Sequence, residues 1–173
     1  MKRGMMKIDI RLLEPEDAET YKKIRLEALL NSPEAFSSSY DEVQDNSLDK
    51  YKVTFQSDNV FTFGAFAANE LIGVVTLARE TAKKAEHRTN ISALYVTSYR
   101  RGFGTGKKLI RTAVDHARSL EGVEQICLSV IVKSNTAKSL YYALGFVPFG
   151  IHKRAVKLGD IYYDEEYMVM FLT

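Results

Sequence analysis

A glycine-rich segment with basic residues on both sides of its glycines, residues 99–108, is the part of the sequence best suited to bind a ligand. It reads Tyr-Arg-Arg-Gly-Phe-Gly-Thr-Gly-Lys-Lys and joins a strand-like run to a run of helical period. Alternating glycines let a backbone approach an object closely, and the free N–H groups and positive dipole end of a helix start favour an anion such as phosphate. The segment predicts a phosphate site; the alternative is an ordinary helix start with solvated basic side chains.

Two familiar phosphate loops do not fit this segment. A Walker loop requires glycine five residues before Gly106, where Arg101 stands, and Ser or Thr where Lys108 stands. The dinucleotide fingerprint requires a third glycine at the position of Lys107. We therefore exclude both nucleotide loops.

The elements that must position this segment follow from the hydrophobic period. Strands are predicted at residues 7–13, 60–67, 71–79, 89–96, 125–132, 146–156 and 161–172. Helices are predicted from residue 15 to about 31, in a shorter stretch within residues 34–56, and at residues 105–120 and 135–144. The run at 125–132 is almost continuously apolar, which is typical of a central strand covered on both faces. The expected order is β-α-α-β-β-β-α-β-α-β-β.

The composition describes one globular domain. Of 173 residues, 46% are hydrophobic and 27% are charged, which is enough for a core without disulfides. The net charge of +2 argues against nucleic acid or an anionic membrane as the main partner. A single cysteine, Cys127, and an N-terminus without an apolar signal core predict a cytoplasmic protein. No apolar run approaches the ~20 residues of a membrane span.

Two motifs resemble those of a known enzyme family. The spacing Arg-x-x-Gly-x-Gly, from Arg101 to Gly106, resembles the acyl-CoA pyrophosphate loop of the GNAT superfamily of N-acetyltransferases, as found in bacterial members. Residues 140–146, Leu-Tyr-Tyr-Ala-Leu-Gly-Phe, look like the second signature of that family, with Asn135 in the turn before it. Weaker similarity is present at residues 11–18, 32–36 and 159–168.

This resemblance implies a fold and an activity. The fold would be α/β, with a mixed, mostly antiparallel sheet and helices on both faces, in a single N-acetyltransferase domain over residues 1–173. The activity would move an acetyl group from acetyl-CoA to a primary amine by direct attack on the thioester, without a metal. An acyl-CoA-binding sensor without turnover and an acyltransferase acting on protein amino groups remain alternatives. The acceptor amine stays open, and the C-terminal edge strands could pair with a second copy to form a homodimer.

The resemblance also implies which residues hold the coenzyme. Backbone amides of the loop would bind the pyrophosphate, and the strand before the loop would pair with the pantetheine amides. The implied residues are Leu94, Tyr95, Val96, Arg101, Gly102, Phe103, Gly104, Thr105, Gly106, Lys107 and Asn135.

Tyr141 is the catalytic candidate, because it stands at the family's tyrosine position, four residues before Gly145. A phenol in that place can protonate the departing thiolate. The alternative is that its ring only packs in the core. Tyr142 is the competitor and points about 100° away around the same helix.

Three assignments stay open or negative. The family asparagine falls more often at the position of Ser134 than at Asn135, and either residue can cap the helix. The general base is not assigned; the candidates, acting through a water chain, are Glu34, Glu80, Glu86 and His87. The histidines show no metal-ligand spacing, and Cys127 is expected to be inert in the core.

Overall fold

Seven strands form one sheet in the computed structural model, which describes residues 7–172. The strand order is β1-β2-β3-β4-β5-β7-β6. The strands are β1 (Ile8–Leu12), β2 (Val60–Ala67), β3 (Glu70–Arg79), β4 (Arg88–Val96), β5 (Gln125–Ile131), β6 (Val147–Leu158) and β7 (Ile161–Phe171). Within the described chain, β4 and β5 form the parallel pair and the other neighbours are antiparallel. The mixed, mostly antiparallel sheet expected from the sequence is confirmed.

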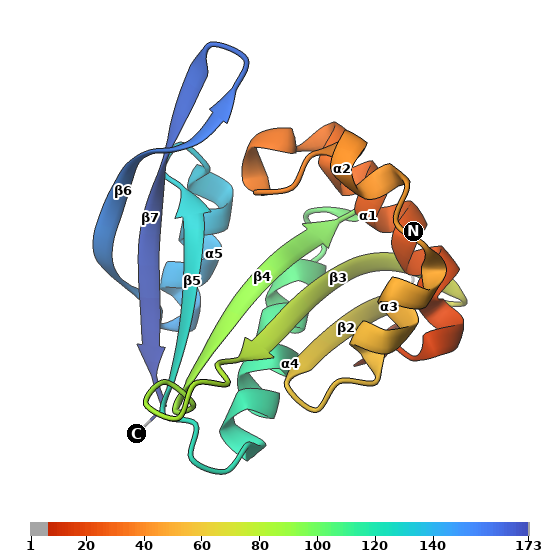
Figure 1. The fold of residues 1–173 in the computed structure, drawn as a ribbon, viewed down its shortest axis with the longest axis horizontal. Helices are drawn as coiled ribbons and strands as arrows, with labels where there is room; N and C mark the ends of the chain where they lie inside the picture. The colour runs from red at the N-terminus through yellow and green to blue at the C-terminus, as the bar shows by residue number, and fades with distance from the viewer. Residues whose placement is uncertain (1–6, 173) are drawn as a thin grey trace, which may run out of the picture.

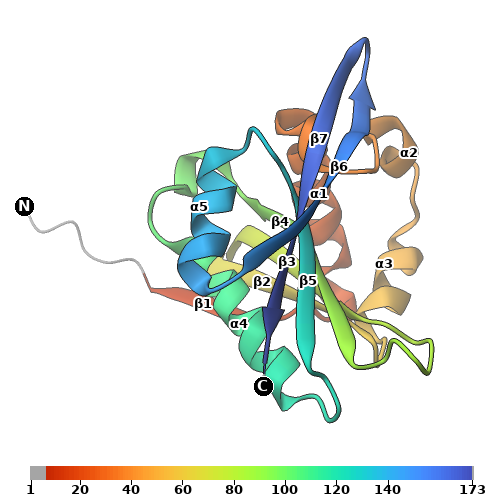
Figure 2. The same ribbon diagram turned by 90° about the vertical axis from the view of Figure 1, so that its left-hand side faces the viewer.

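Helices cover both faces of this sheet, as Figures 1 and 2 show. On one face lie α1 (Ala18–Asn31), α2 (Tyr40–Gln44) and α3 (Leu48–Phe55), and on the other lie α4 (Thr105–Ser119) and α5 (Asn135–Leu144). Three short 3-10 helices connect the elements: η1 (Pro15–Asp17), η2 (Pro33–Ala35) and η3 (Ser98–Arg100).

The stretch expected to hold one short helix contains two. Ser39 starts α2 with a capping box in which Glu42 bonds back to the Ser39 N–H at 2.7 Å. The helix ends at Gln44 with Asp45 as its C-cap, and Ser47 stands at the N-cap position of α3. Short polar side chains compete with helical backbone bonds and favour caps and turns, so this polar sequence interrupts the helical period.

Two apolar cores hold the layers together. The helix predicted at residues 105–120 is present as α4, and its apolar stripe of Leu109, Ile110, Ala113, Val114 and Ala117 is buried in the core, with Leu120 partly buried beside it. On the opposite face, α1 buries side chains such as Tyr21 and Ile24 in a second core that includes Val74 and Tyr95. Tyr95 therefore connects β4 with the helix that precedes η2.

The prediction that β5 is covered on both faces is wrong. Ile126 and Leu128 are buried in the core under α4 and α5, but Cys127 is half-buried and Ser129 is exposed on the other face. The α1 core gathers residues of β3 and β4 and none of β5. One face of β5 is thus left available to a site.

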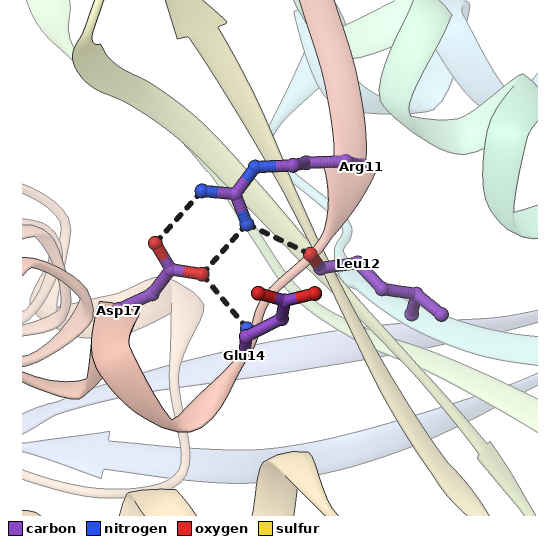
Figure 3. A network of polar contacts seen from close by, with 4 residues as sticks. All are labelled: Arg11, Leu12, Glu14 and Asp17. Carbon is purple, nitrogen blue, oxygen red and sulfur yellow. Dashed lines mark hydrogen bonds and ion pairs between the residues drawn. The ribbon is translucent and has the colours of Figure 1, made fainter.

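A polar corner fixes the chain where β1 turns towards α1 (Figure 3). The Arg11 guanidinium donates to both carboxylate oxygens of Asp17, at 2.7 and 2.9 Å, and Asp17 also accepts from the Glu14 N–H at 2.7 Å. The hydrogen bond from Arg11 is the main cause that lowers the pKa of Asp17. Arg11 also lies over the Phe66 ring, 4.3 Å from its centroid. These contacts set the start of α1 relative to the sheet.

Candidate active site

The central strands β4 and β5 pair at one end and then diverge. Their ladder joins Arg88, Thr89 and Asn90 to residues 125–127, and Figure 1 shows the two strands separating beyond it. The β4 backbone from residue 91 onwards therefore has no strand partner on the side of β5 within the described chain. Unpaired N–H and C=O groups at a strand edge can pair with another extended chain of amides.

A bulge alters β4 within this unpaired part. Between the pairs Ser92 with Thr76 and Tyr95 with Val74, the register shifts by one residue. Ala93 takes up the extra length with a φ of 55°, in the left-handed region that non-glycine residues rarely adopt. A bulge re-aims the groups that follow it, so residues 94–96 present their backbone to the opening.

The opening leads into a cleft of about 680 Å³. Its walls come from the end of β4, the N-terminal turn of α4, the start of α5 and the η2 segment. Every residue predicted to hold the coenzyme lines this cleft except Phe103, which is 64% exposed and outside the lining. The fold thus brings together a strand, a loop and a helix start that are separated in the sequence.

The first turn of α4 supplies hydrogen-bond donors to the cleft. Gly104 has a φ of 80° and places the chain at the helix start, where the first helical bond runs from the Lys108 N–H to the Gly104 carbonyl at 3.0 Å. The amides of residues 105–107 precede that bond and have no helical carbonyl partner. The Thr105 hydroxyl is buried and has no hydrogen-bond partner within residues 7–172. This donor set suits an anion.

The lining of the cleft also includes basic residues. Arg100, Arg101, Lys107 and Lys133 line it. The Arg101 Nε donates to the Val96 carbonyl at 2.9 Å, and its guanidinium lies 5.2 Å from the centroid of the Tyr95 ring. Arg101 therefore braces the corner between β4 and the loop and still presents its charge to the cleft.

The predicted catalytic residue, Tyr141, lies beside this cleft and not in its lining. Its ring is 6% exposed and packs edge-on against Phe146, with 5.9 Å between centroids. Its α5 neighbours Ala137 and Leu140 line the cleft. Burial raises the pKa of Tyr141 to about 12, and its hydroxyl has no hydrogen-bond partner in the described chain. The phenol is therefore held protonated.

Tyr142 points elsewhere. Its hydroxyl donates to Glu166 on β7 at 3.2 Å, and Lys138 pairs with the same carboxylate at 3.4 Å. Burial, followed by the bond to Glu166, raises the pKa of Tyr142. Tyr142 thus belongs to a polar contact between α5 and β7, outside the cleft.

The start of α5 differs from the sequence prediction. Of the two residues proposed to cap the helix, Ser134 occupies the N-cap position, but its side chain makes no capping hydrogen bond. Asn135 is the first residue of the helix and lines the cleft together with Ser134. Both side chains therefore face the space of the site.

The residues named as a possible general base lie in different parts of the structure. Of the four groups named as a possible base, Glu34 lines the cleft, and Glu80 instead accepts a hydrogen bond from Asn90 at 2.7 Å. Burial raises the pKa of the Cys127 thiol.

Within residues 7–172, no group of His, Cys, Asp and Glu side chains could hold a metal ion. None of the helices in that range has the length and apolar character that a membrane crossing requires.

Sequence reasoning missed several lining residues. Lys133 and Thr136 at the start of α5, and Ser32 and Phe36 around η2, all face the cleft. The charge of Lys133, next to a predicted helix start, was the available signal for the first group. The second group lies in residues 32–36, which already showed weak similarity to the family, but the sequence did not place them at the cleft, because η2 reaches it only through the tertiary fold.

The comparisons with known proteins agree with this geometry. The family model of the GNAT acetyltransferase domain matches residues 10–167. No curated protein matches the chain. An acetyltransferase of the GNAT family from Streptococcus pneumoniae is similar in structure, with a TM-score of 0.88, 21% identity, and coverage of 96% of this chain and 100% of that chain.

Two further solved structures have the same fold. The ribosomal-protein-alanine N-acetyltransferase from Brucella melitensis gives a TM-score of 0.82 at 18% identity, covering 95% of this chain and 99% of that chain. yncA from Salmonella typhimurium, solved with its cofactor acetyl-CoA, gives a TM-score of 0.84 at 16% identity, covering 96% of this chain and 95% of that chain. The chain belongs to the GNAT acetyltransferase family. Its class of activity is acetyl transfer from acetyl-CoA.

Proposed function

We propose that this protein moves an acetyl group from acetyl-CoA to a primary amine by direct attack of the amine on the thioester. One observation carries the proposal: a single cleft joins an unpaired strand edge, β4, to a helix start with free N–H donors and basic side chains. A ligand with both a diphosphate and an extended arm of amides matches these two features together.

Several groups along the cleft are suited to bind acetyl-CoA. The amides of residues 105–107 and the orphan Thr105 hydroxyl would donate to the pyrophosphate. Arg101 and Lys107 would add charge-assisted contacts. The backbone of residues 94–96 would pair with the pantetheine arm, and an N–H in this segment would face the thioester oxygen, where a preorganised donor stabilises the charge that develops.

Tyr141 is the proposed acid for the departing thiolate. Two observations support this role: its hydroxyl is uncommitted, and the neighbouring Leu140 lines the cleft. A phenol with a pKa of about 12 is a weak acid towards a free thiolate. Proton transfer from Tyr141 becomes easier where the coenzyme A sulfur lies in the same water-poor environment, because burial raises the pKa of the coenzyme A thiol as well. The contribution is therefore modest.

Direct attack is favoured over a covalent acetyl-enzyme. A cysteine relay requires an accessible thiolate. Cys127 is half-buried and does not line the cleft, and burial raises the pKa of its thiol, which keeps it protonated.

The experiment is a turnover assay. Purified protein is incubated with acetyl-CoA and a panel consisting of spermidine, kanamycin, a peptide with a free N-terminus and a lysine peptide with a blocked N-terminus, and free thiol is measured. We expect amine-dependent thiol release with at least one member. Tight acetyl-CoA binding without release for any amine would favour the sensor alternative.

A further inference from the structure

We infer that Glu34 binds the ammonium form of the acceptor amine, and that acceptors are therefore cationic at the reacting end. This inference rests on the proposed function. It concerns the part of the cleft that the coenzyme residues do not occupy.

Glu34 is set apart by charge. Among the residues of the described chain that line the cleft, it is the one acid, and it shares the lining with four basic residues, Arg100, Arg101, Lys107 and Lys133. One of these, Arg100, also pairs with Glu70 at 3.2 Å. A cationic amine entering this cleft is repelled by those basic groups and attracted by Glu34 alone. The coenzyme phosphates match the basic groups, so Glu34 is left for the second substrate.

Its position separates it from the coenzyme residues. Glu34 belongs to η2, which continues from α1 on one face of the sheet and lies against β5 and β6. The donors and three of the basic groups come from α4, α5 and the loops before them, and both helices lie on the other face (Figure 2). The cleft is therefore bounded by both faces where β4 and β5 diverge. An acceptor arriving from the η2 face meets Glu34 before the thioester.

The Glu34 carboxylate is also uncommitted. It is half-buried and makes no hydrogen bond or ion pair within residues 7–172. Two other acids already have partners: Glu27 accepts from the Tyr95 hydroxyl at 2.9 Å, and Glu80 accepts from Asn90 at 2.7 Å. A carboxylate that is partly desolvated and unpaired favours a cation as its partner.

Binding, and not proton removal, is the role assigned to Glu34. A carboxylate is a much weaker base than an alkylamine, so it stabilises an ammonium more readily than it deprotonates one. The bound ammonium gives its proton to water, and the neutral nitrogen then forms the bond to the acyl carbon as the C–S bond breaks. The loss of its charge should therefore appear in the KM for the amine. Charged hydrogen bonds are worth enough for a change of about 10- to 100-fold.

The test compares Glu34→Gln, which keeps shape and removes charge, with Glu34→Asp, which keeps charge. Glu16→Gln is the matched control, because Glu16 also follows a proline in a 3-10 helix but is exposed and outside the cleft. Steady-state kinetics use whichever amine of the panel the native protein acetylates, and calorimetry measures acetyl-CoA affinity. We expect Glu34→Gln to raise the amine KM about 10- to 100-fold, with kcat within about threefold and acetyl-CoA affinity unchanged.

Glu34→Asp should retain most of the native KM, and Glu16→Gln all of it. An unchanged amine KM in Glu34→Gln would overturn the inference, and so would an equal loss of acetyl-CoA affinity, which indicates a general disturbance of the cleft. If Glu34→Gln fails to fold, the test depends on Glu34→Asp. A native-like amine KM in Glu34→Asp supports the inference, and an amine KM raised by about 10- to 100-fold refutes it. If the native protein acetylates no amine, the proposed function fails and the inference falls with it, a result distinct from the previous ones.

Discussion

A valine at Gly106 separates loss of coenzyme binding from loss of fold. A Cβ added at Gly106 would lie 3.6 Å from Leu140 Cδ2 and 3.9 Å from Val96 Cγ2, which are ordinary contact distances. Its φ is outside the left-handed region, so a side chain brings no backbone strain. Both neighbours line the cleft, and the branched methyls of valine would extend into the space beside the first amides of α4.

The expected magnitudes follow from these contacts. Alanine is favoured over glycine in a helix by roughly 0.5–1 kcal/mol, and valine falls between the two. Neither Gly106→Val nor the smaller change Gly106→Ala should therefore lower the free energy of unfolding by more than about 0.5 kcal/mol. Hydrogen bonds to a charged group are worth about 1.5–3 kcal/mol each. Losing one such bond weakens binding by about 10- to 150-fold and losing two weakens it more, so Gly106→Val should weaken acetyl-CoA binding by at least about 10-fold, and Gly106→Ala by only a few-fold.

Calorimetric titration with acetyl-CoA and urea unfolding measure the two quantities separately. Gly150→Val is the matched control, because Gly150 lies on β6 with no atom within 4 Å of its added Cβ and outside the cleft. Gly104 is less suitable, since its φ of 80° makes any side chain strained. A folded Gly106→Val protein that binds acetyl-CoA like the native protein would refute the placement of the pyrophosphate at this turn.

Three further substitutions test other parts of the account. Tyr141→Phe should lower kcat by about 10–100-fold and leave acetyl-CoA affinity unchanged, whereas Tyr142→Phe should lose almost nothing; the reverse pattern in steady-state kinetics would remove Tyr141 as the acid. Arg101→Ala should weaken acetyl-CoA binding by about 1 kcal/mol, and titration at rising salt should show a smaller salt dependence than in the native protein. Because Asp17 has a lowered pKa in the fold, its pair with Arg11 stabilises above the usual Asp pKa of about 3.9 and is lost as the pH falls through the folded value. Asp17→Asn should thus cost about 1 kcal/mol in urea unfolding at pH 7 and progressively less as the pH falls below about 3.9; a loss that does not change with pH would contradict the ion-pair explanation.

The regular elements were predictable because their hydrophobic period is local. The α4 stripe from Leu109 to Ala117 and the strands on each side of Ala68 follow directly from that period. The one region predicted poorly, residues 34–56, is polar and interrupted by Ser39 and Ser47, which start separate helices. In this region the hydrophobic pattern repeats over too few residues to define an element.

The cleft was only partly predictable. The loop from Arg101 to Gly106 carries its own signal, since glycine spacing reflects backbone geometry. The divergence of β4 from β5 has no signal in the sequence, because it depends on the strand pairing ending after Asn90. The bulge at Ala93 has none either, because alanine rarely adopts a positive φ and its presence does not predict one. The sequence also could not single out Glu34 among the acids as a residue of the cleft, because η2 reaches the cleft only through the tertiary fold.

The most direct test of the central claim is the mass of the protein and of the acceptor after incubation with acetyl-CoA. Direct attack predicts that the protein alone with acetyl-CoA gains no acetyl group. On addition of an accepted amine, thiol release should equal the amount of acetylated amine. A stoichiometric acetyl adduct on the protein that disappears when amine is added, with Cys127 as the modified residue, would contradict direct transfer.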